Sequence, residues 1–444
     1  EMLRRFEFKF QTPSLKKSAG NKLEVVITTP ETCIATDGKG YKRELSRIRW
    51  DFMIVDEAHK IKNYDSKIAH CLRSDFQFLN CLLLTGTPLQ NNTDELWSLL
   101  NFVDREAFDD RERFLRKFGD LKDSNQLEEL HKHLKPLLLR REKEHVEKKV
   151  PPKEEIIIDV ELTAPQKQYY RALYEQRTGF LHSRGTKDGP SLTNLAMELR
   201  KCCNHPFLIK GAETELARHF VNETPVDQLV KSSGKMMLLD KLLPKLKAEG
   251  HRVLIFSQFR IMLNIIEDYM IMRGHTFERV DGSITGRQRQ SAIDRYTNSG
   301  ADGGRKTDEV FCMLLSTRAG GVGINLTVAD TVIIFDSDWN PQNDIQAQAR
   351  AHRIGQTKRV KVYRFLTAKT YESVMFQASS HKLGLDYAVM GGVSKNLSGI
   401  TDKSADNFSS MSKKELENLL KHGAYSVFNE RCSVALSSSS RPLL

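Results

Sequence analysis

The sequence predicts an α/β protein with two lobes, each built on a parallel sheet. Short apolar runs alternate with segments of helical pattern near the start of the chain, and the same alternation returns between residues 254 and 370. A charged, helix-forming stretch at 126–149 separates the two regions. Strands that alternate with helices are typical of parallel sheets.

In the first region, apolar runs of strand length predict three strands, and a segment of helical pattern predicts a helix. The strands are expected at 23–28, 51–55 and 81–85, and the helix at 92–103. The run Phe52–Val55 passes directly into Asp56 and Glu57. We expect this strand to be buried on both faces, with its acids at the carboxyl end, where parallel sheets bind ligands. The alternative is a strand end with solvated charges.

The second region follows a mostly helical segment that ends near residue 245. Its strands are expected at 253–257, 311–316 and 331–335, with a helix at 260–273. A Gly/Ser/Asn-rich tail begins at 391, and it contains one amphipathic helix at 412–423 before an end of low complexity, which we expect to be disordered. The predicted domains are therefore 1–150, 151–245, 246–390 and 391–444.

Composition limits the class of partner and compartment. The 444 residues carry a net charge of +11 and a pI of about 9.2, which favours an acidic partner such as nucleic acid. The 7 cysteines are an odd number without paired spacing, so we expect a reducing, intracellular compartment. The cluster from Cys202 to His205 suggests zinc, but its spacing does not suit tetrahedral ligation.

Four constellations have the residue types that phosphoryl transfer needs. Asp56 and Glu57 form an acid pair that can hold Mg²⁺ and activate water. Thr85-Gly86-Thr87-Pro88 follows the next strand, and a glycine-rich turn with Gly320, Gly321 and Gly323 follows a later one. Arg350 and Arg353, three residues apart, are expected on one face of a helix. Taken singly, the acid pair is a strand end with solvated charges, the two glycine-containing segments are ordinary turns, and the arginine pair is a solvated helix face. Together they match the division of labour between Mg²⁺-binding acids and arginine fingers.

The motifs resemble those of the Snf2 family of superfamily 2 helicase-like ATPases, the motors of chromatin remodelling. The match covers roughly residues 24–390, and the tail at 412–425 resembles the segment that follows the motor in the Kismet-like chromodomain-helicase-DNA-binding subgroup. The motifs are DEAH at 56–59, LTGTPLQNN at 84–92, ELWSLLNFV at 95–103, LRKCCNHPFLI at 199–209, SGKMMLLDKLL at 233–243, VLIFSQF at 253–259, RVDGS at 279–283 and the block 314–356.

This resemblance implies two RecA-like lobes with a helical insertion between them, and a DNA-dependent ATPase that translocates on nucleosomal DNA without separating strands. The implied cofactors are ATP and Mg²⁺. The implied partners are double-stranded DNA, histones and remodelling-complex subunits. The implied compartment is the nucleus. Asp56 would hold Mg²⁺ through water, Glu57 would polarise the attacking water, and His59 would couple that site to the TGTP turn. Arg350 and Arg353 would be the arginine fingers.

Further roles follow from the same resemblance. Nucleotide-proximal positions would be Gly86, Gly321, Gly323 and Gln346, the last aligning the arginine-bearing helix. The DNA groove would be lined by Thr28, Thr29, Ser257, Gln258, Ser316, Thr317 and Trp339. Hydroxyls, amides and basic groups suit phosphate contacts, which position a duplex without reading its sequence. A Trp beside a strand is also a common core residue, so Trp339 has a packing alternative.

One family motif is missing from the printed sequence. A P-loop needs Gly, four residues and then Gly-Lys-Ser/Thr, whose amides and Lys hold phosphates. Gly38-Lys39 and Gly234-Lys235 both lack the remaining motif residues. We expect the chain to begin partway through lobe 1, which would then be incomplete, have an exposed sheet edge and hydrolyse ATP poorly.

Two alternatives to the ATPase motor fragment remain. In the first alternative, the chain is a non-catalytic DNA-binding motor remnant. In the second alternative, it is a strand-separating DEAH helicase. The RAHRIGQ sequence at 350–356 and the long helical segment at 153–245 disfavour the helicase, because both are Snf2-like.

Overall fold

The computed structural model describes residues 24–35, 42–86, 93–119, 124–139, 147, 150–183, 192–220, 222–284, 286–299, 309–317 and 323–379. The chain divides into two compact units, the first ending at Leu130 and the second beginning at His131. The predicted domain boundaries at 150, 245 and 390 stay predictions. The tail from 391, with its predicted helix, lies outside the described residues.

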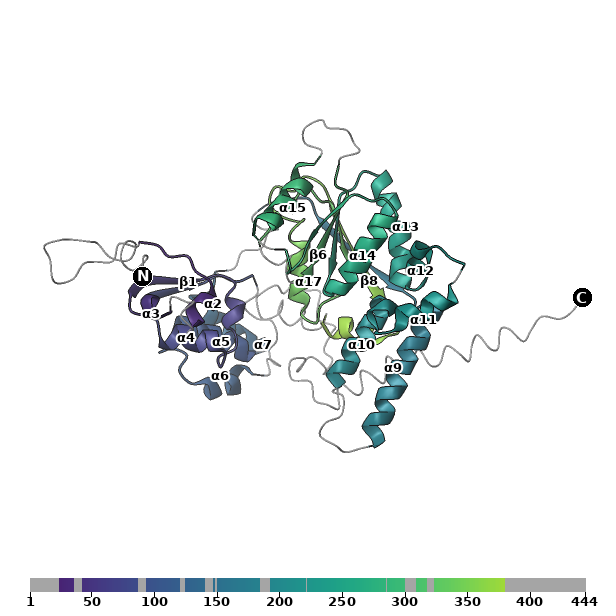
Figure 1. Ribbon diagram of the computed structural model, residues 1–444. Helices are drawn as coiled ribbons and strands as arrows, with labels where there is room; N and C mark the ends of the chain where they lie inside the picture. Colours follow the sequence, from purple (N-terminus) through teal and green to yellow (C-terminus); the bar gives the residue numbers. More distant parts are fainter. Residues whose placement is uncertain are drawn as a thin grey trace, which may run out of the picture. The chain divides into compact units, whose positions relative to one another are not determined.

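Unit 1 contains two parallel strands, β1 (Arg49–Val55) and β2 (Gln77–Leu83), in the register that places Val55 beside Leu83. Its helices are α2 (Pro30–Ile34), α3 (Lys42–Leu45), α4 (Lys67–Ser74), α5 (Thr93–Val103) and α6 (Arg111–Phe118), followed by α7 (Ser124–Leu134) (Figure 1). Side chains of α4 and α5 pack on one face of the sheet, where they contact Met53, Val55, Cys81 and Leu83. The strands predicted at 51–55 and 81–85 and the helix at 92–103 are thus present, although β2 begins earlier and ends at Leu83.

Two expectations for unit 1 are wrong. The segment predicted as a strand at 23–28 has no strand pairing in residues 24–28, and Ile27 is 95% exposed. The β1 strand is covered on one face only, since Phe52 is 64% exposed and Ile54 is also exposed. Alternate residues of a strand point to opposite faces. Among the described residues, helices pack on just one of these faces, so the other keeps its apolar side chains in solvent.

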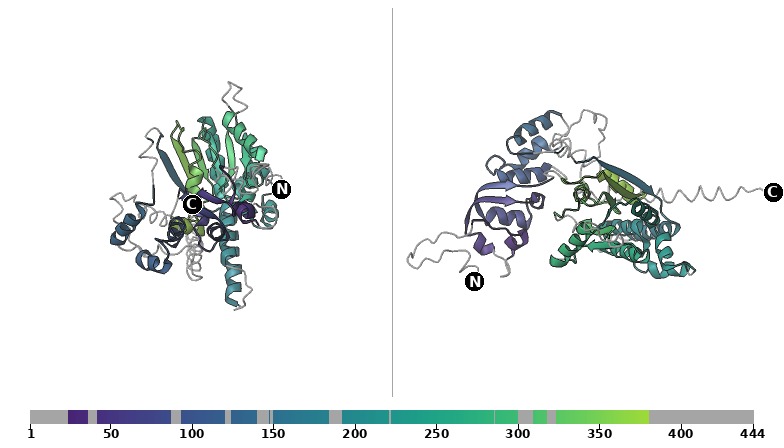
Figure 2. Two further views of the ribbon diagram at one scale, coloured as in Figure 1. Left: turned by 90° about the vertical axis from the view of Figure 1, so that its left-hand side faces the viewer. Right: turned by 90° about the horizontal axis from the view of Figure 1, so that it is seen from above.

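Unit 2 is built on a six-stranded, all-parallel sheet in the order β3-β8-β7-β4-β6-β5. The strands are β3 (Lys153–Val160), β4 (Val253–Ser257), β5 (Phe277–Val280), β6 (Cys312–Ser316), β7 (Thr331–Ile334) and β8 (Val360–Thr367). They run side by side in the left view of Figure 2. The three strands predicted for this region correspond to β4, β6 and β7. The mixed α/β fold with parallel sheets is as predicted.

Helices cover both faces of this sheet (Figure 1). On one face α13 (Gly234–Ala248) and α14 (Arg260–Met272) bury apolar side chains against Val253 and Ile255. On the other, α15 (Gly286–Asn298) and α17 (Pro341–Gln348) contribute to a core with Leu254 and Phe256. All five residues of β4 are buried, as expected for a central parallel strand.

The segment predicted to be mostly helical contains one strand that the sequence did not reveal. Lys153–Val160 forms β3, an edge strand that pairs with β8, and its alternating exposure fits a strand covered on one face. The rest is helical: α9 (Ala164–Ser183), α10 (Leu192–Asn204), α11 (Ala212–His219) and α12 (Pro225–Lys231) precede α13. Tyr170 of α9 accepts the amide of Tyr371 at 3.0 Å, which ties these helices to the segment after β8.

No helix in the described ranges combines the length and the apolar character needed to cross a lipid bilayer.

Candidate functional site

The acids of unit 1 lie on a strained turn directly after β1. Glu57 has φ 50° and ψ 52°, the left-handed region that residues other than glycine rarely adopt. Its amide donates to the Asp56 carboxylate at 2.9 Å, and a short 3₁₀ helix, η1 (Ala58–Ile61), follows. Strain of this kind is retained where surrounding contacts hold it, and it clusters at functional sites. Asp56 is exposed and Glu57 half-buried, so both carboxylates are reachable from solvent.

Backbone hydrogen bonds tie this turn to the end of β2. The amide of Ala58 donates to the Leu84 carbonyl at 2.9 Å, and the amide of Leu84 donates to the Val55 carbonyl at 2.9 Å. Thr85 and Gly86 follow immediately, so the two predicted motifs meet at the carboxyl edge of the sheet. Thr87 and Pro88 of the TGTP motif lie outside the described residues.

His59 lies beside Glu57, with its Nδ1 3.2 Å from a Glu57 carboxylate oxygen. Burial lowers the pKa of His59 below its usual value, and the nearby Glu57 charge opposes that shift. The imidazole is therefore neutral at pH 7. The backbone of Ala58 and Leu84 joins this region to the segment that precedes Thr85 and Gly86, and the predicted coupling role of His59 stays a prediction.

Thr28 and Thr29 lie before α2, and both are exposed. The hydroxyl of Thr29 accepts the amide of Thr32 at 3.3 Å and so caps α2, with Pro30 as the first helical residue. Thr29 therefore has a structural task in addition to any ligand contact.

In unit 2, the predicted polar positions lie at the carboxyl edge of the six-stranded sheet. Ser257 ends β4 and pairs in register with Ser316, which ends β6. Ser257 is fully buried and Thr317 nearly so, whereas Ser316 and Gln258 are partly exposed. Parallel strands place their carboxyl ends together, which is why residues far apart in sequence meet here.

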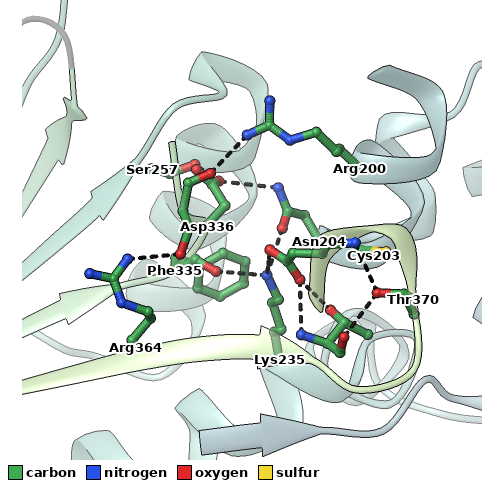
Figure 3. Close-up of polar contacts among 12 residues, drawn as sticks. Arg200, Cys203, Asn204, Lys235, Ser257, Phe335, Asp336, Arg364 and Thr370 are labelled. Carbon is green, nitrogen blue, oxygen red and sulfur yellow. Dashed lines mark hydrogen bonds and ion pairs between the residues drawn. The ribbon is translucent and has the colours of Figure 1, made fainter. Parts of the chain in front are cut away.

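Ser257 is held by Asp336, the second residue after β7 (Figure 3). Its hydroxyl donates to one carboxylate oxygen of Asp336 at 2.5 Å, and the amide of Gln258 donates to the other at 2.7 Å. The hydroxyl of Ser257 is thus engaged inside the unit, and its predicted contact with DNA stays a prediction. Sequence reasoning missed Asp336, because a single acid after a strand carries no signal of its own.

Trp339 is half-buried in the cluster formed by α9, α10 and Tyr371. Its ring lies 5.7 Å from that of Tyr371, and the Arg200 guanidinium lies 5.8 Å from the Trp339 ring. The packing alternative for Trp339 therefore has direct support, while part of its surface stays accessible.

The two arginines do not lie on a helical face, contrary to the prediction. The helix α17 ends at Gln348, and Arg350 and Arg353 follow in turns. The carbonyl of Arg350 accepts the amide of Leu326 at 3.1 Å, which ties this turn to a distant segment. Arg350 is buried, and Arg353 is partly exposed and donates to the carbonyl of Gly323 at 3.2 Å.

The structure thus brings Arg353 to the glycine-rich segment, where Gly323 has φ 51°. Gln346 is half-buried on α17. Gly320 and Gly321 lie outside the described residues.

A buried ion pair anchors α17. Asp344 accepts from Arg364 of β8, and Arg364 also donates to Glu155 of β3 at 2.8 Å. Burial raises the pKa of Asp344 to about 7, and the Arg364 charge opposes that rise. The helix before the arginines is therefore fixed to two strands by charged contacts that the sequence did not reveal.

The cluster from Cys202 to His205 has a packing role. His205 contacts the Leu229 carbonyl through Nε2 at 2.9 Å and accepts the Phe207 amide on Nδ1 at 3.1 Å, so both ring nitrogens are engaged. Burial raises the pKa of Cys203 to about 12 and raises that of Cys202 as well, so both thiols stay protonated. In the described ranges, no group of three or more His, Cys, Asp or Glu side chains gathers to hold a metal ion.

Comparison with known protein families finds two matching domains, the first of which extends beyond unit 1 into unit 2. Residues 8–208 match the SNF2-related domain, and residues 234–355 match the helicase conserved C-terminal domain. With its two parallel sheets and the motifs at their carboxyl edges, the chain belongs to the Snf2 family.

Within that family, the chain is similar to chromodomain-helicase-DNA-binding proteins. It is 48% identical over 442 residues to protein 9 of Mus musculus, and 49% identical over 429 residues to protein 7 of Homo sapiens. It is also 49% identical over 412 residues to protein 8 of Xenopus tropicalis. These matches cover 97%, 95% and 91% of this chain and 15%, 14% and 18% of the relatives. The chain therefore spans less than a fifth of the length of the curated relatives it matches.

Proposed function

We propose that this chain is the motor part of an ATP-dependent chromatin remodeller, which couples ATP hydrolysis to translocation along the duplex DNA of nucleosomes. The observation that carries the proposal is the strained Asp56-Glu57 turn, bonded through Ala58 to the strand end that precedes Thr85 and Gly86. Histones, further subunits of a remodelling complex and a nuclear location belong to the same proposal.

In the proposed chemistry, unit 1 handles the metal and the water. Asp56 is an exposed carboxylate at a strand end and fits a hydrated Mg²⁺, which commonly binds proteins through one or two carboxylates and keeps its other ligands as water and phosphate oxygens. When bound, Mg²⁺ neutralises phosphate charge. Glu57 orients the attacking water and accepts its proton. The neutral His59 beside Glu57 holds that carboxylate in place.

Unit 2 supplies the positive charge and the duplex contacts. The guanidinium groups of Arg350 and Arg353 stabilise charge that develops on the transferred phosphoryl group, for which arginine fingers contribute about 10³–10⁵ in rate. Gln258, Ser316 and the accessible part of Trp339 face the duplex, which is held through its phosphates. The proposal assigns nucleotide binding to Gly86, Gly321, Gly323 and Gln346. It assigns DNA contacts to Thr28, Thr29 and Thr317.

The printed chain by itself is proposed to be a poor ATPase. Its sequence contains no Gly-x-x-x-x-Gly-Lys-Ser/Thr, the segment that grips the β- and γ-phosphates. Lys235, which follows Gly234, is fully buried and paired with Glu372, so it is not a phosphate ligand. The second candidate function for the printed chain is a DNA-binding module without catalysis.

The test compares the printed chain with the same chain preceded by a P-loop-bearing segment from a Snf2-family relative. We expect DNA-stimulated ATP hydrolysis only in the longer protein. There, Glu57→Gln should lower the turnover number by about 10²–10⁴. Glu112→Gln, the same change at an exposed position on α6, should leave it unaltered. Turnover in the printed chain would contradict the proposed inactivity, and full activity of Glu57→Gln would contradict the catalytic role. Release of single strands from a duplex would revive the helicase alternative.

A further inference from the structure

A buried cation joins the helical segment of unit 2 to the ends of its sheet (Figure 3). Lys235, the second residue of α13, is 0% exposed and paired with Glu372, whose side chain is 4% exposed. Its ammonium group donates to Glu372 at 2.6 Å, to Asn204 at 2.9 Å and to the Phe335 carbonyl at 2.9 Å. Each of its three protons therefore has an acceptor.

From Lys235, the contacts continue toward the turn after β4. The amide group of Asn204, the last residue of α10, accepts from Lys235 and donates to Asp336 at 3.1 Å. Asp336 in turn accepts the Ser257 hydroxyl and the Gln258 amide. The series Lys235–Asn204–Asp336 therefore ends on the backbone of Gln258.

Arg200, one helical turn before Asn204, fixes the neighbouring segment. It donates to the Ser337 carbonyl at 2.9 Å, and its guanidinium lies 5.5 Å from the Phe259 ring and 5.8 Å from the Trp339 ring. Two positions proposed to face DNA, Gln258 and Trp339, are thus held by side chains of α10 and α13. None of the holding groups is itself exposed.

The chemistry of this network suits a positioning task better than a stabilising one. A buried ion pair gains little net stability over apolar residues of the same volume, because both charges lose their hydration. What a network with satisfied donors and acceptors supplies is one defined geometry. Here that geometry includes the amide of Gln258 and the indole of Trp339.

We propose that Asn204 and Lys235 are positioning residues for duplex binding: through Asp336 they hold the Ser257–Gln258 turn in the conformation that meets the DNA backbone. This inference rests on the proposed function, since it concerns how the same unit grips its duplex.

The test uses the printed chain and a double substitution, Lys235→Met with Glu372→Gln, which removes both buried charges together. Its matched control is Lys231→Met with Glu223→Gln. That pair makes the same chemical change at an ion pair of 2.6 Å on α12, where Lys231 is 53% exposed. Asn204→Leu is the second variant, and it breaks the series without removing a charge.

Two measurements are made on each protein at a temperature at which it is folded. Affinity for a duplex DNA is measured across salt concentrations, and amide hydrogen exchange is followed in peptides spanning 256–262. We expect both test variants to bind about tenfold more weakly, the size of one or two lost contacts. The salt dependence should be unchanged, and exchange at Gln258 and Phe259 should accelerate locally. The control should match the original chain.

Three results would overturn the inference. Unchanged affinity in both test variants means that the Ser257–Gln258 turn keeps its conformation without Asn204 and Lys235. A shallower salt dependence, by about one phosphate contact, means that Lys235 meets DNA directly. Faster exchange throughout unit 2 means that the network is a general folding contact. Failure of the original chain to bind duplex at all is a separate result, because it overturns the proposed DNA contact of this unit.

Discussion

The two units build the same kind of edge by different means. In unit 1, the polar groups after β1 are accessible and are held by backbone bonds, as at Glu57 and Ala58. In unit 2, Ser257 at the end of β4 and Asp336 after β7 are buried, and Asn204 and Lys235 from distant helices hold them. The sheets differ accordingly: Phe52 of β1 is 64% exposed, whereas Phe256 of β4 is 0% exposed. Coverage of both faces of a sheet is what makes buried charge possible at its edge, because the surrounding helices supply the partners.

The strongest test of this difference is the same substitution in the two strands. Phe256→Ala should cost about 3–5 kcal/mol of the free energy of unfolding, because it leaves a cavity between β4 and its covering helices. Phe52→Ala should change it by less than about 0.5 kcal/mol, because the side chain is mostly solvated. Urea titration, followed by hydrogen exchange in peptides from each unit, measures the unfolding free energy of unit 1 and of unit 2 separately. Similar costs would mean that β1 is as well covered as β4.

In unit 2, the contribution of His205 to the free energy of unfolding should be lost in acid. Burial lowers the pKa of His205 to about 4, so its contribution to stability is present above the unfolded value near 6.5 and is lost as pH falls. The loss amounts to about 3 kcal/mol by pH 4. The difference in unfolding free energy between the original chain and His205→Gln should therefore shrink or reverse between pH 7 and pH 4.

Asp344 gives unit 2 an opposite dependence, because its raised pKa of about 7 favours the folded state at lower pH. Comparison with His205→Gln isolates the histidine. His59→Gln in unit 1 should show a smaller effect, since His59 is only partly buried. A pH-independent difference for His205→Gln would contradict the buried, neutral state of the imidazole.

Adding one methyl group distinguishes the close packing of unit 2 from the open turn of unit 1. A Cβ on Gly234 would lie 2.2 Å from the Glu161 carbonyl oxygen, so Gly234→Ala forces backbone to move. We expect a cost of about 1–3 kcal/mol. Gly86→Ala meets nothing within 4 Å and should leave the unfolding free energy nearly unchanged. Thermal unfolding of both variants provides the measurement, and a neutral Gly234→Ala would show that α13 is loosely packed.

The smallest effect on folding, with a visible effect on solubility, is expected at the open face of unit 1. Ile54→Lys should leave the unfolding free energy within about 0.5 kcal/mol, because Ile54 is exposed. It should reduce self-association of the chain, since charge on an open strand face opposes edge and face pairing. Light scattering against concentration measures this. Ile255→Lys, at a fully buried position in β4, should prevent folding of unit 2. Unchanged scattering for Ile54→Lys would mean that the open face does not drive association.

The local pattern and identity of residues determined the positions of several helices and strands and of the motif residues. The apolar run of β4 and the helical segment of α5 lie at the predicted positions, because the local pattern of each element depends on its own residues. The placement of Asp56 and Glu57 at a strand end, beside Thr85 and Gly86, also followed from the order of short segments. The family resemblance could be recognised in the same way, since motif residues keep their spacing.

Tertiary structure alone decided what lies between distant segments. The strand β3 pairs with β8 some two hundred residues away in sequence, and a run such as Lys153–Val160 does not state its partner. The turn that carries Arg350 is bonded to Leu326, and the buried hydroxyl of Ser257 has its acceptor in Asp336, from a different strand end. Lys235 finds three acceptors from three different segments. Periodicity reports which face of an element is apolar, whereas the partner of a buried charge depends on how the whole chain packs.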